Sequence, residues 1–185
     1  MEENFTPDNV KNRLILAGLK ELDKHGVVDF SLRRVAIEAG VSCAAPYRHF
    51  KDKDELIASI VSYVMEGWTL LSGQISELYS DNVSGLITEL AVSGLRFWIA
   101  NGNFRTVIIN ASKITSDGLS AMSEFERPLL NAINLYAENG GESKNDLKFR
   151  VLSMLYGSIT LVDGGYEESD SAAESLRSAI LEILA

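Results

Sequence analysis

The sequence is poor in the residues that most often build disulfides and metal sites. It has one cysteine and two histidines among its 185 residues, and only three prolines. One cysteine cannot form an internal disulfide, and with only two histidines beside it too few ligands remain for a structural zinc site. We therefore expect no bound metal and no other cofactor.

Long apolar runs and a targeting segment are missing as well. No stretch approaches 18 uninterrupted apolar residues, so the sequence predicts no membrane-spanning segment and no membrane partner. The N-terminus reads MEENFTPDNVKNR, which is polar and acidic and has no apolar core of a secretory signal. We expect a soluble protein of the cytoplasm.

Catalytic machinery is the third absence. The sequence contains no glycine-rich phosphate loop and no combination of a nucleophile with a nearby base. The small number of histidines and cysteines points the same way. We expect no catalytic residues and no enzymatic activity.

Positive charge is scarce overall, yet it is concentrated in one segment. The formal net charge is −9, from 17 Lys and Arg against 26 Asp and Glu. Residues 1–60 are nearly balanced, with nine basic and ten acidic side chains, whereas residues 61–185 have eight and sixteen. Within residues 31–53, five basic side chains stand against only two acidic ones. This asymmetry indicates two regions with different tasks.

The dominant pattern along the chain is helical. Apolar residues recur at spacings of three and four, and no segment alternates convincingly as a β-strand does. With 46% apolar residues the chain can bury a core. The pattern predicts an all-α protein with helices near residues 8–24, 31–39, 42–49, 53–79, 83–101, 104–114, 118–139, 144–164 and 170–184.

Two short helices in the basic segment are predicted to form a helix-turn-helix. Ser31 is a good N-cap for the first helix, Gly40 ends it, and Ser42 is expected to cap the second. Two helices joined by a short turn that contains glycine are typical of this motif, whose second helix enters the major groove of DNA. A three-helix bundle with a solvated basic face is the alternative that these residues leave open.

The stretch SLRRVAIEAGVSCAAPYRHFKDKDEL, residues 31–56, resembles the DNA-binding signature of the tetracycline-repressor (TetR) family of transcriptional regulators. The resemblance is carried by Ser31, Val35-Ala36, EAGVS at 38–42, YRHF at 47–50, Lys53 and Glu55-Leu56. It implies an N-terminal three-helix DNA-binding domain over residues 1–53 and an all-helical domain for effector binding and dimerisation over residues 54–185. It also implies phosphate contacts from Ser31, Arg33, Ser42, Tyr47, His49 and Lys53.

Base contacts are expected from the helix opened by Ser42. Residues 43–45, Cys-Ala-Ala, offer almost no hydrogen bonds to base edges, so direct readout falls on Arg48, a natural partner of guanine. Pro46 would be the fourth residue of this helix, where it removes a backbone hydrogen bond and bends the first turn. The complete predicted DNA-binding set is Ser31, Arg33, Ser42, Cys43, Ala44, Ala45, Tyr47, Arg48, His49 and Lys53.

Cys43 has two interpretations. At the start of a helix its thiolate would be stabilised by the amide ends, which makes it a candidate redox sensor placed against DNA. The alternative is a small, weakly polar residue that fills space at the groove surface.

The last two predicted helices favour a homodimer. They carry apolar stripes at helical spacing, and two such helices from each protomer would form a four-helix bundle. The alternative is that these stripes belong to the core of a single chain. The predicted interface residues are Leu152, Leu155, Ile159, Leu176, Ile180 and Ile183.

A cavity between the helices of the second domain is the expected site of a small apolar or cationic effector. The candidate lining residues are Trp98, Phe104, Met122, Phe125 and Tyr156. The predicted function is a dimeric repressor that the effector releases from a double-stranded DNA operator. In the alternative, the same DNA binder is controlled by a protein partner, and the aromatic residues form a core without a cavity.

Overall fold

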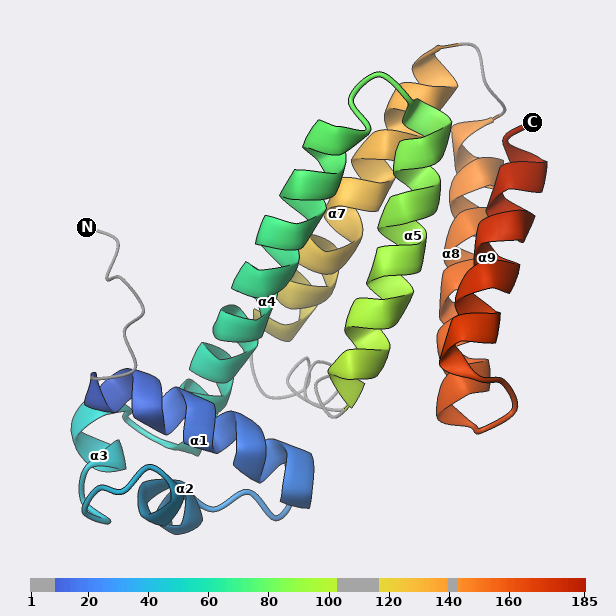
Figure 1. Cartoon of the computed structure of the whole chain (residues 1–185). Coiled ribbons are helices and arrows are strands. Elements are labelled where there is room, and N and C mark those ends of the chain that lie inside the picture. Colours follow the sequence, from blue (N-terminus) through green and yellow to red (C-terminus); the bar gives the residue numbers. More distant parts are fainter. Residues whose placement is uncertain (1–8, 103–116, 140–142) are drawn as a thin grey trace. The chain divides into compact units, whose positions relative to one another are not determined.

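The computed structural model describes residues 9–102, 117–139 and 143–185, with side chains from residue 121 onward in the second stretch (Figure 1). Every regular element in these described stretches is an α-helix, which confirms the predicted all-α fold class. The helix predicted near residues 104–114 lies outside the described residues.

The chain divides into two compact units, and the helix α4 (Lys53–Leu78) belongs partly to each. The first unit contains the described chain up to residue 66 and also residues 117–121, and the second is formed by residues 67–102 and 122–185. Because α4 contributes to both units, this division does not test the predicted domain boundary at residues 53 and 54.

The first unit contains α1 (Val10–His25), α2 (Leu32–Glu38), α3 (Pro46–His49) and the first part of α4. Its core is apolar and includes Phe50, which is 3% exposed, as the sequence predicts for the residue that closes this bundle. Helices α1 and α4 approach closely at Gly18, where a Cβ atom would lie 2.6 Å from Cδ1 of Ile60. A side chain at position 18 would therefore have to displace the side chain of Ile60.

The start of α3 differs from the prediction. The sequence pattern places Ser42 as its N-cap, but α3 begins at Pro46 and its N-cap is Ala45. The backbone N–H of Ala45 instead donates to the carbonyl of Ser42 at 2.9 Å, so residues 42–45 form a turn. Proline has no N–H and a fixed φ, so it opens a helix readily and is disfavoured four residues into one.

The second unit is built from the end of α4 together with α5 (Val83–Ala100), α7 (Asp117–Glu138), α8 (Lys144–Asp163) and α9 (Ser169–Ile183). Helix α5 packs against α8 and α9, and these two pack against each other. The first and last residues of α5, α7, α8 and α9 lie within about two residues of the predicted ranges, which is the usual uncertainty of a helix end.

Helices α4 and α5 are long and apolar enough to cross a membrane by length and composition alone. About half of each helix's most apolar stretch is buried inside the folded chain, at 44% and 50%. Such burial is typical of core helices in a helical protein, which meet the same compositional test.

Candidate nucleic-acid interface

Side-chain caps and glycine turns fix the helices of the first unit. The Oγ of Ser31 accepts a hydrogen bond from the backbone N–H of Arg34 at 3.5 Å, which confirms Ser31 as the N-cap of α2. Gly40 follows α2 with a φ of 66°, a conformation that glycine adopts without strain. The N–H of Val41 then donates to the carbonyl of Ala36 at 3.0 Å. The path from α2 to α3 is thus defined by local hydrogen bonds.

Most of the predicted DNA-reading residues lie on the surface of the turn and of α3. Tyr47 is 65% exposed. Ala45 differs, because its side chain is 8% exposed and belongs to the core of the unit. The residues of this segment that are exposed are Ser42, Cys43, Ala44, Tyr47, Arg48 and His49.

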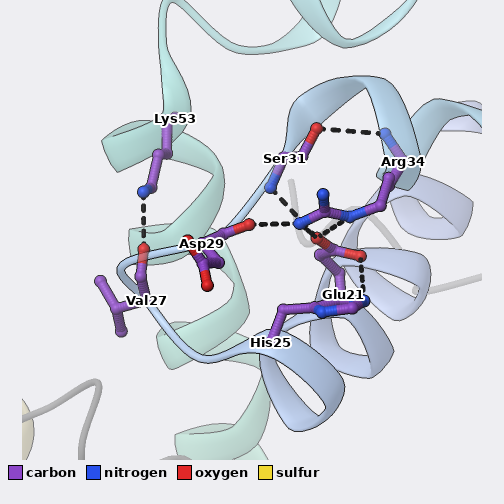
Figure 2. A network of polar contacts seen from close by, with 7 residues as sticks. All are labelled: Glu21, His25, Val27, Asp29, Ser31, Arg34 and Lys53. Carbon is purple, nitrogen blue, oxygen red and sulfur yellow. Dashed lines mark hydrogen bonds and ion pairs between the residues drawn. The ribbon is translucent and has the colours of Figure 1, made fainter.

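The basic side chains of this segment divide into two groups. Arg33 is exposed, as are Arg48 and Lys51. Lys53 is half-buried, and its Nζ donates to the carbonyl of Val27 at 2.6 Å (Figure 2). The same ammonium lies 5.8 Å from the centre of the Phe30 ring. In this state the predicted phosphate contact Lys53 instead joins the start of α4 to the α1–α2 loop.

Arg34 also contacts α1, where its guanidinium reaches the carboxylate of Glu21 while 45% of the Arg34 side chain stays exposed. Its Nε donates to Glu21 Oε1 at 2.7 Å, and the backbone N–H of Ser31 reaches the same oxygen at 3.2 Å (Figure 2). Nε2 of His25 lies 3.8 Å from the other carboxylate oxygen. The hydrogen bond to Glu21 raises the pKa of Arg34. Glu21 thus binds groups from both ends of the α1–α2 connection.

Sequence reasoning missed Glu21, although a signal was present. Seven residues span two turns of a helix, so Glu21 lies on the same face of α1 as Leu14, and the 3.6-residue period also brings Gly18 to this face. Both are part of the packed side of α1, and Glu21 is only 6% exposed. An acidic residue in register with an apolar stripe predicts a buried partner of opposite charge.

The structure brings the predicted effector residues together in two pairs, Trp98 with Phe125 and Met122 with Tyr156. Trp98 and Phe125 are both buried, with ring centroids 4.9 Å apart, in an aromatic cluster that also contains Trp68 and Phe97. The indole N–H of Trp68 donates to the carbonyl of Phe125 at 3.0 Å. Phe104 lies outside the described residues.

Met122 and Tyr156 lie together beside a carboxylate that no sequence pattern singles out. The hydroxyl of Tyr156 donates to Glu126 Oε1 at 2.6 Å and lies 3.3 Å from the sulfur of Met122. All three residues are half-buried. Burial, and then the hydrogen bond to Glu126, raises the pKa of Tyr156 well above its ordinary value. The neutral hydroxyl therefore remains a donor to the carboxylate.

The predicted dimer residues occupy two different environments. Leu155, Ile159, Leu176 and Ile180 are at most 2% exposed within a single chain, where they form the core between the helices. Leu152 and Ile183 are half-buried. The large apolar side chains exposed on α8 and α9 are Phe149, Leu161 and Leu181.

Metal ligands are not clustered in the part of the chain that the structure describes. In these ranges, no group of three or more His, Cys, Asp or Glu side chains is placed so that it could hold a metal ion.

Comparison with known sequences finds relatives of the first unit. Residues 14–60 match the profile of the family described as bacterial regulatory proteins, tetR family. Over 63 residues the chain is 33% identical to HTH-type transcriptional regulators from Staphylococcus aureus strains such as USA300 and MW2. This match covers 34% of the chain and 34% of each relative, so the alignment spans about a third of these proteins.

Solved structures share the fold over nearly the whole chain. A protein of unknown function from Rhodococcus sp. RHA1 superposes with a TM-score of 0.79 at 20% identity and 98% coverage of both chains. PfmR, a TetR family regulator from Thermus thermophilus, gives 0.69 at 20% identity, covering 93% of this chain and 97% of its own. The multidrug binding protein EbrR, complexed with imidazole, gives 0.70 at 17% identity and 96% coverage of each.

Proposed function

We propose that this chain is a transcriptional regulator of the tetR family, that it binds a DNA operator as a homodimer, and that a small molecule releases it from the operator. The observation that carries this proposal is the segment of residues 42–49, which is exposed except at Ala45 and Pro46, follows a capped α2 and ends in a basic turn of helix. A helix-turn-helix presents its second helix to the major groove in this way.

Recognition of the operator relies on few base contacts. Arg48 is exposed on α3, and a guanidinium can donate two hydrogen bonds to guanine, whereas Cys43 and Ala44 offer only small surfaces. The buried Ala45 does not take part. Sequence-dependent DNA shape supplies the remaining specificity.

Selection of bound duplexes from a random library tests this function. The expected result is an inverted repeat with one or two fixed guanines in each half-site. Between the fixed guanines, sequences that favour a particular DNA shape should be enriched. Failure to enrich any sequence, even at low ionic strength, would contradict DNA binding. Six or more invariant positions per half-site would contradict the shape-based readout.

Dimerisation uses the outward faces of α8 and α9. Phe149 is 74% exposed, and Leu161 and Leu181 are also exposed, so these side chains are available to a second protomer. Two-fold dimers are the commonest assemblies, and a single helix-turn-helix holds DNA weakly.

Sedimentation of a charged variant tests this surface. Phe149→Asp is expected to weaken the dimer by a factor of about ten or more, because a carboxylate would be buried at the contact. Val28→Asp is the matched control, since Val28 is 91% exposed in the first unit. Equal effects of both substitutions would contradict the assignment.

The effector site is proposed at the aromatic cluster and the adjoining pair of Tyr156 and Glu126. Aromatic walls bind apolar molecules, and the half-buried carboxylate of Glu126 favours a cationic group on them. The likeness to EbrR, a multidrug binding protein, supports a small-molecule site in this fold. Since α4 runs from the first unit into the second, it is the connection through which an effector would act.

Thermal unfolding with a panel of apolar amines and their neutral analogues tests this site. The amines are expected to raise Tm more than the analogues in the unaltered chain, and Glu126→Gln is expected to remove the difference. If no compound raises Tm, the second candidate function, control by a protein partner, is favoured instead.

A further inference from the structure

Two adjacent arginines on α2 face different surroundings. Both side chains are exposed, Arg34 to 45%, but their contacts differ. Arg33 makes no ion pair among the described residues, whereas Nη2 of Arg34 lies 2.5 Å from Glu21 Oε1 on α1. Successive residues of a helix point about 100° apart, so one side chain can reach solvent while the next reaches a neighbouring helix. Their proximity in the sequence therefore does not give them the same role.

The carboxylate of Glu21 needs the partners that surround it. Only 6% of Glu21 is exposed, and a buried carboxylate must be paired or hydrogen-bonded. Oε1 accepts from Nε of Arg34 at 2.7 Å and from the backbone N–H of Ser31 at 3.2 Å. A bond from the cap residue and one from the first turn of α2 thus meet on a single oxygen atom of α1.

The same guanidinium also holds the connection that precedes α2. Its Nη2 donates to the carbonyl of Asp29, two residues before the N-cap Ser31 (Figure 2). Arg34 thus contacts α1 and the loop while its own backbone N–H is bound by the cap. These bonds fix the position and the entry angle of α2 together.

The orientation of α2 determines the orientation of α3, which carries Tyr47 and Arg48. Helix α2 packs against both α1 and α3, and α3 has only four residues. A helix of a single turn has little stability of its own, so its direction is set by what it packs against. A change in the α1–α2 contact is therefore transmitted to Tyr47 and Arg48.

We propose that Glu21 and Arg34 are positioning residues for DNA recognition, which hold α2 and α3 in the orientation that reads the groove, and that Arg34 itself contacts no DNA. This inference rests on the proposed function. It gives the two arginines of α2 different roles: Arg33 contacts DNA, and Arg34 links α2 to α1 through Glu21.

The test is the affinity for a duplex recovered by selection with the unaltered chain, measured by fluorescence anisotropy at several salt concentrations. Arg33→Gln is expected to flatten the slope of log Kd against log salt concentration by about 0.9 per protomer, because one phosphate contact is lost. Arg34→Gln is expected to weaken binding about fivefold to tenfold with an unchanged slope, because its guanidinium is bound to Glu21 and to the carbonyl of Asp29 rather than to a phosphate.

Glu21→Gln gives the sharpest contrast. This variant removes a negative charge near the interface and frees Arg34, so simple electrostatics predicts tighter binding. Positioning predicts the opposite, a loss of about threefold to tenfold, because Arg34 loses its anchor. In the double variant Glu21→Gln/Arg34→Gln, the expected loss of affinity is smaller than the product of the two single losses. Neither side chain is then left without its charged partner.

Folding is checked by circular dichroism on each variant below its Tm. If Arg34→Gln does not fold, Arg34→Lys replaces it, and a smaller loss with an unchanged slope is expected because lysine keeps the charge but not the planar fork. A flattened slope for Arg34→Gln or Arg34→Lys, tighter binding by Glu21→Gln, or unchanged affinity in folded variants each overturns the proposal. If the unaltered chain selects no duplex, the proposed function fails first and this inference with it.

Discussion

The two units of the chain bury different kinds of groups at their centres. The first unit encloses a carboxylate, Glu21, whose hydrogen bonds run from one helix to the next. The second encloses an aromatic cluster, and its buried hydroxyl groups bind the backbone of their own helices. Thr88, for example, donates to the carbonyl of Ser84 at 2.8 Å. Among the described residues, apolar packing and a hydrogen bond between helices occur at both centres, since Trp68 donates to the Phe125 carbonyl, but only the first centre contains a buried charged group.

This difference would suit the proposed function, in which a ligand controls a DNA-binding unit. Hydrogen bonds require particular distances and angles, so they suit a surface that must meet DNA in one orientation. Apolar packing has no direction, and apolar cores tolerate changes of shape if their volume is kept. Substitution of Glu21 or Arg34 should therefore act mainly on the geometry of the first unit, and substitution in the aromatic cluster mainly on stability.

The largest expected effect is on the stability of the second unit. Trp68 is 1% exposed, and its ring centroid lies 4.8 Å from that of Phe125. Trp68→Ala is expected to lower the free energy of unfolding by about 3–5 kcal/mol, measured by urea denaturation. Tyr166→Ala, at a residue that is 81% exposed, is the control and should change it by less than about 0.5 kcal/mol. Similar losses from both would remove the contrast between core and surface on which the comparison depends.

The next effect is on DNA binding, with stability unchanged. Arg48→Ala is expected to weaken operator binding by about 10-fold to 100-fold and to relax the guanine preference, because a bidentate contact is lost. Tm should stay constant, since the side chain is exposed. Lys148→Ala removes the same charge from the second unit and should leave the affinity nearly unchanged. Retention of the guanine preference by Arg48→Ala would assign base reading to another residue.

A pair of glycines tests the close packing of the first unit. Gly18→Ala is expected to destabilise the chain by about 1–2 kcal/mol, because the added methyl group meets Ile60 and must displace it. Gly67→Ala in α4 has open space around the new atom and should stabilise the chain by about 0.5–1 kcal/mol through helix propensity. The same sign for both substitutions in thermal unfolding would contradict the packing described at Gly18.

The smallest expected effect concerns the cap of α2. Ser31→Ala is expected to lower the free energy of unfolding by about 0.5–1 kcal/mol, since one N–H of the first turn loses its acceptor. Ser62→Ala, at an exposed mid-helix position of α4, should be neutral or slightly stabilising. Chemical denaturation of both variants checks the difference. An unchanged free energy of unfolding for Ser31→Ala would show that the cap does not stabilise the fold.

Local signals in the sequence were sufficient for the helices. Ser31, Gly40 and the apolar periodicity placed most elements of the described chain, because caps, turns and helical faces depend on neighbouring residues. The same logic failed at Ser42, where a proline four residues later was the stronger local signal.

Partners across helices could not be predicted in the same way. Periodicity shows that Leu155 and Ile180 lie on apolar faces but not whether their own chain or a second one covers those faces, and the single chain covers both. The link from Glu21 to Arg34, 13 residues apart, depends on how α1 and α2 pack. The Tyr156–Glu126 pair, 30 residues apart, depends likewise on tertiary packing.

The most direct test of the central claim is the stoichiometry with which the purified chain binds a selected duplex, measured by sedimentation of labelled DNA. We expect two chains on each inverted repeat, with an affinity for DNA that falls steeply as salt concentration rises. A chain that stays monomeric and binds no duplex at low ionic strength would contradict it.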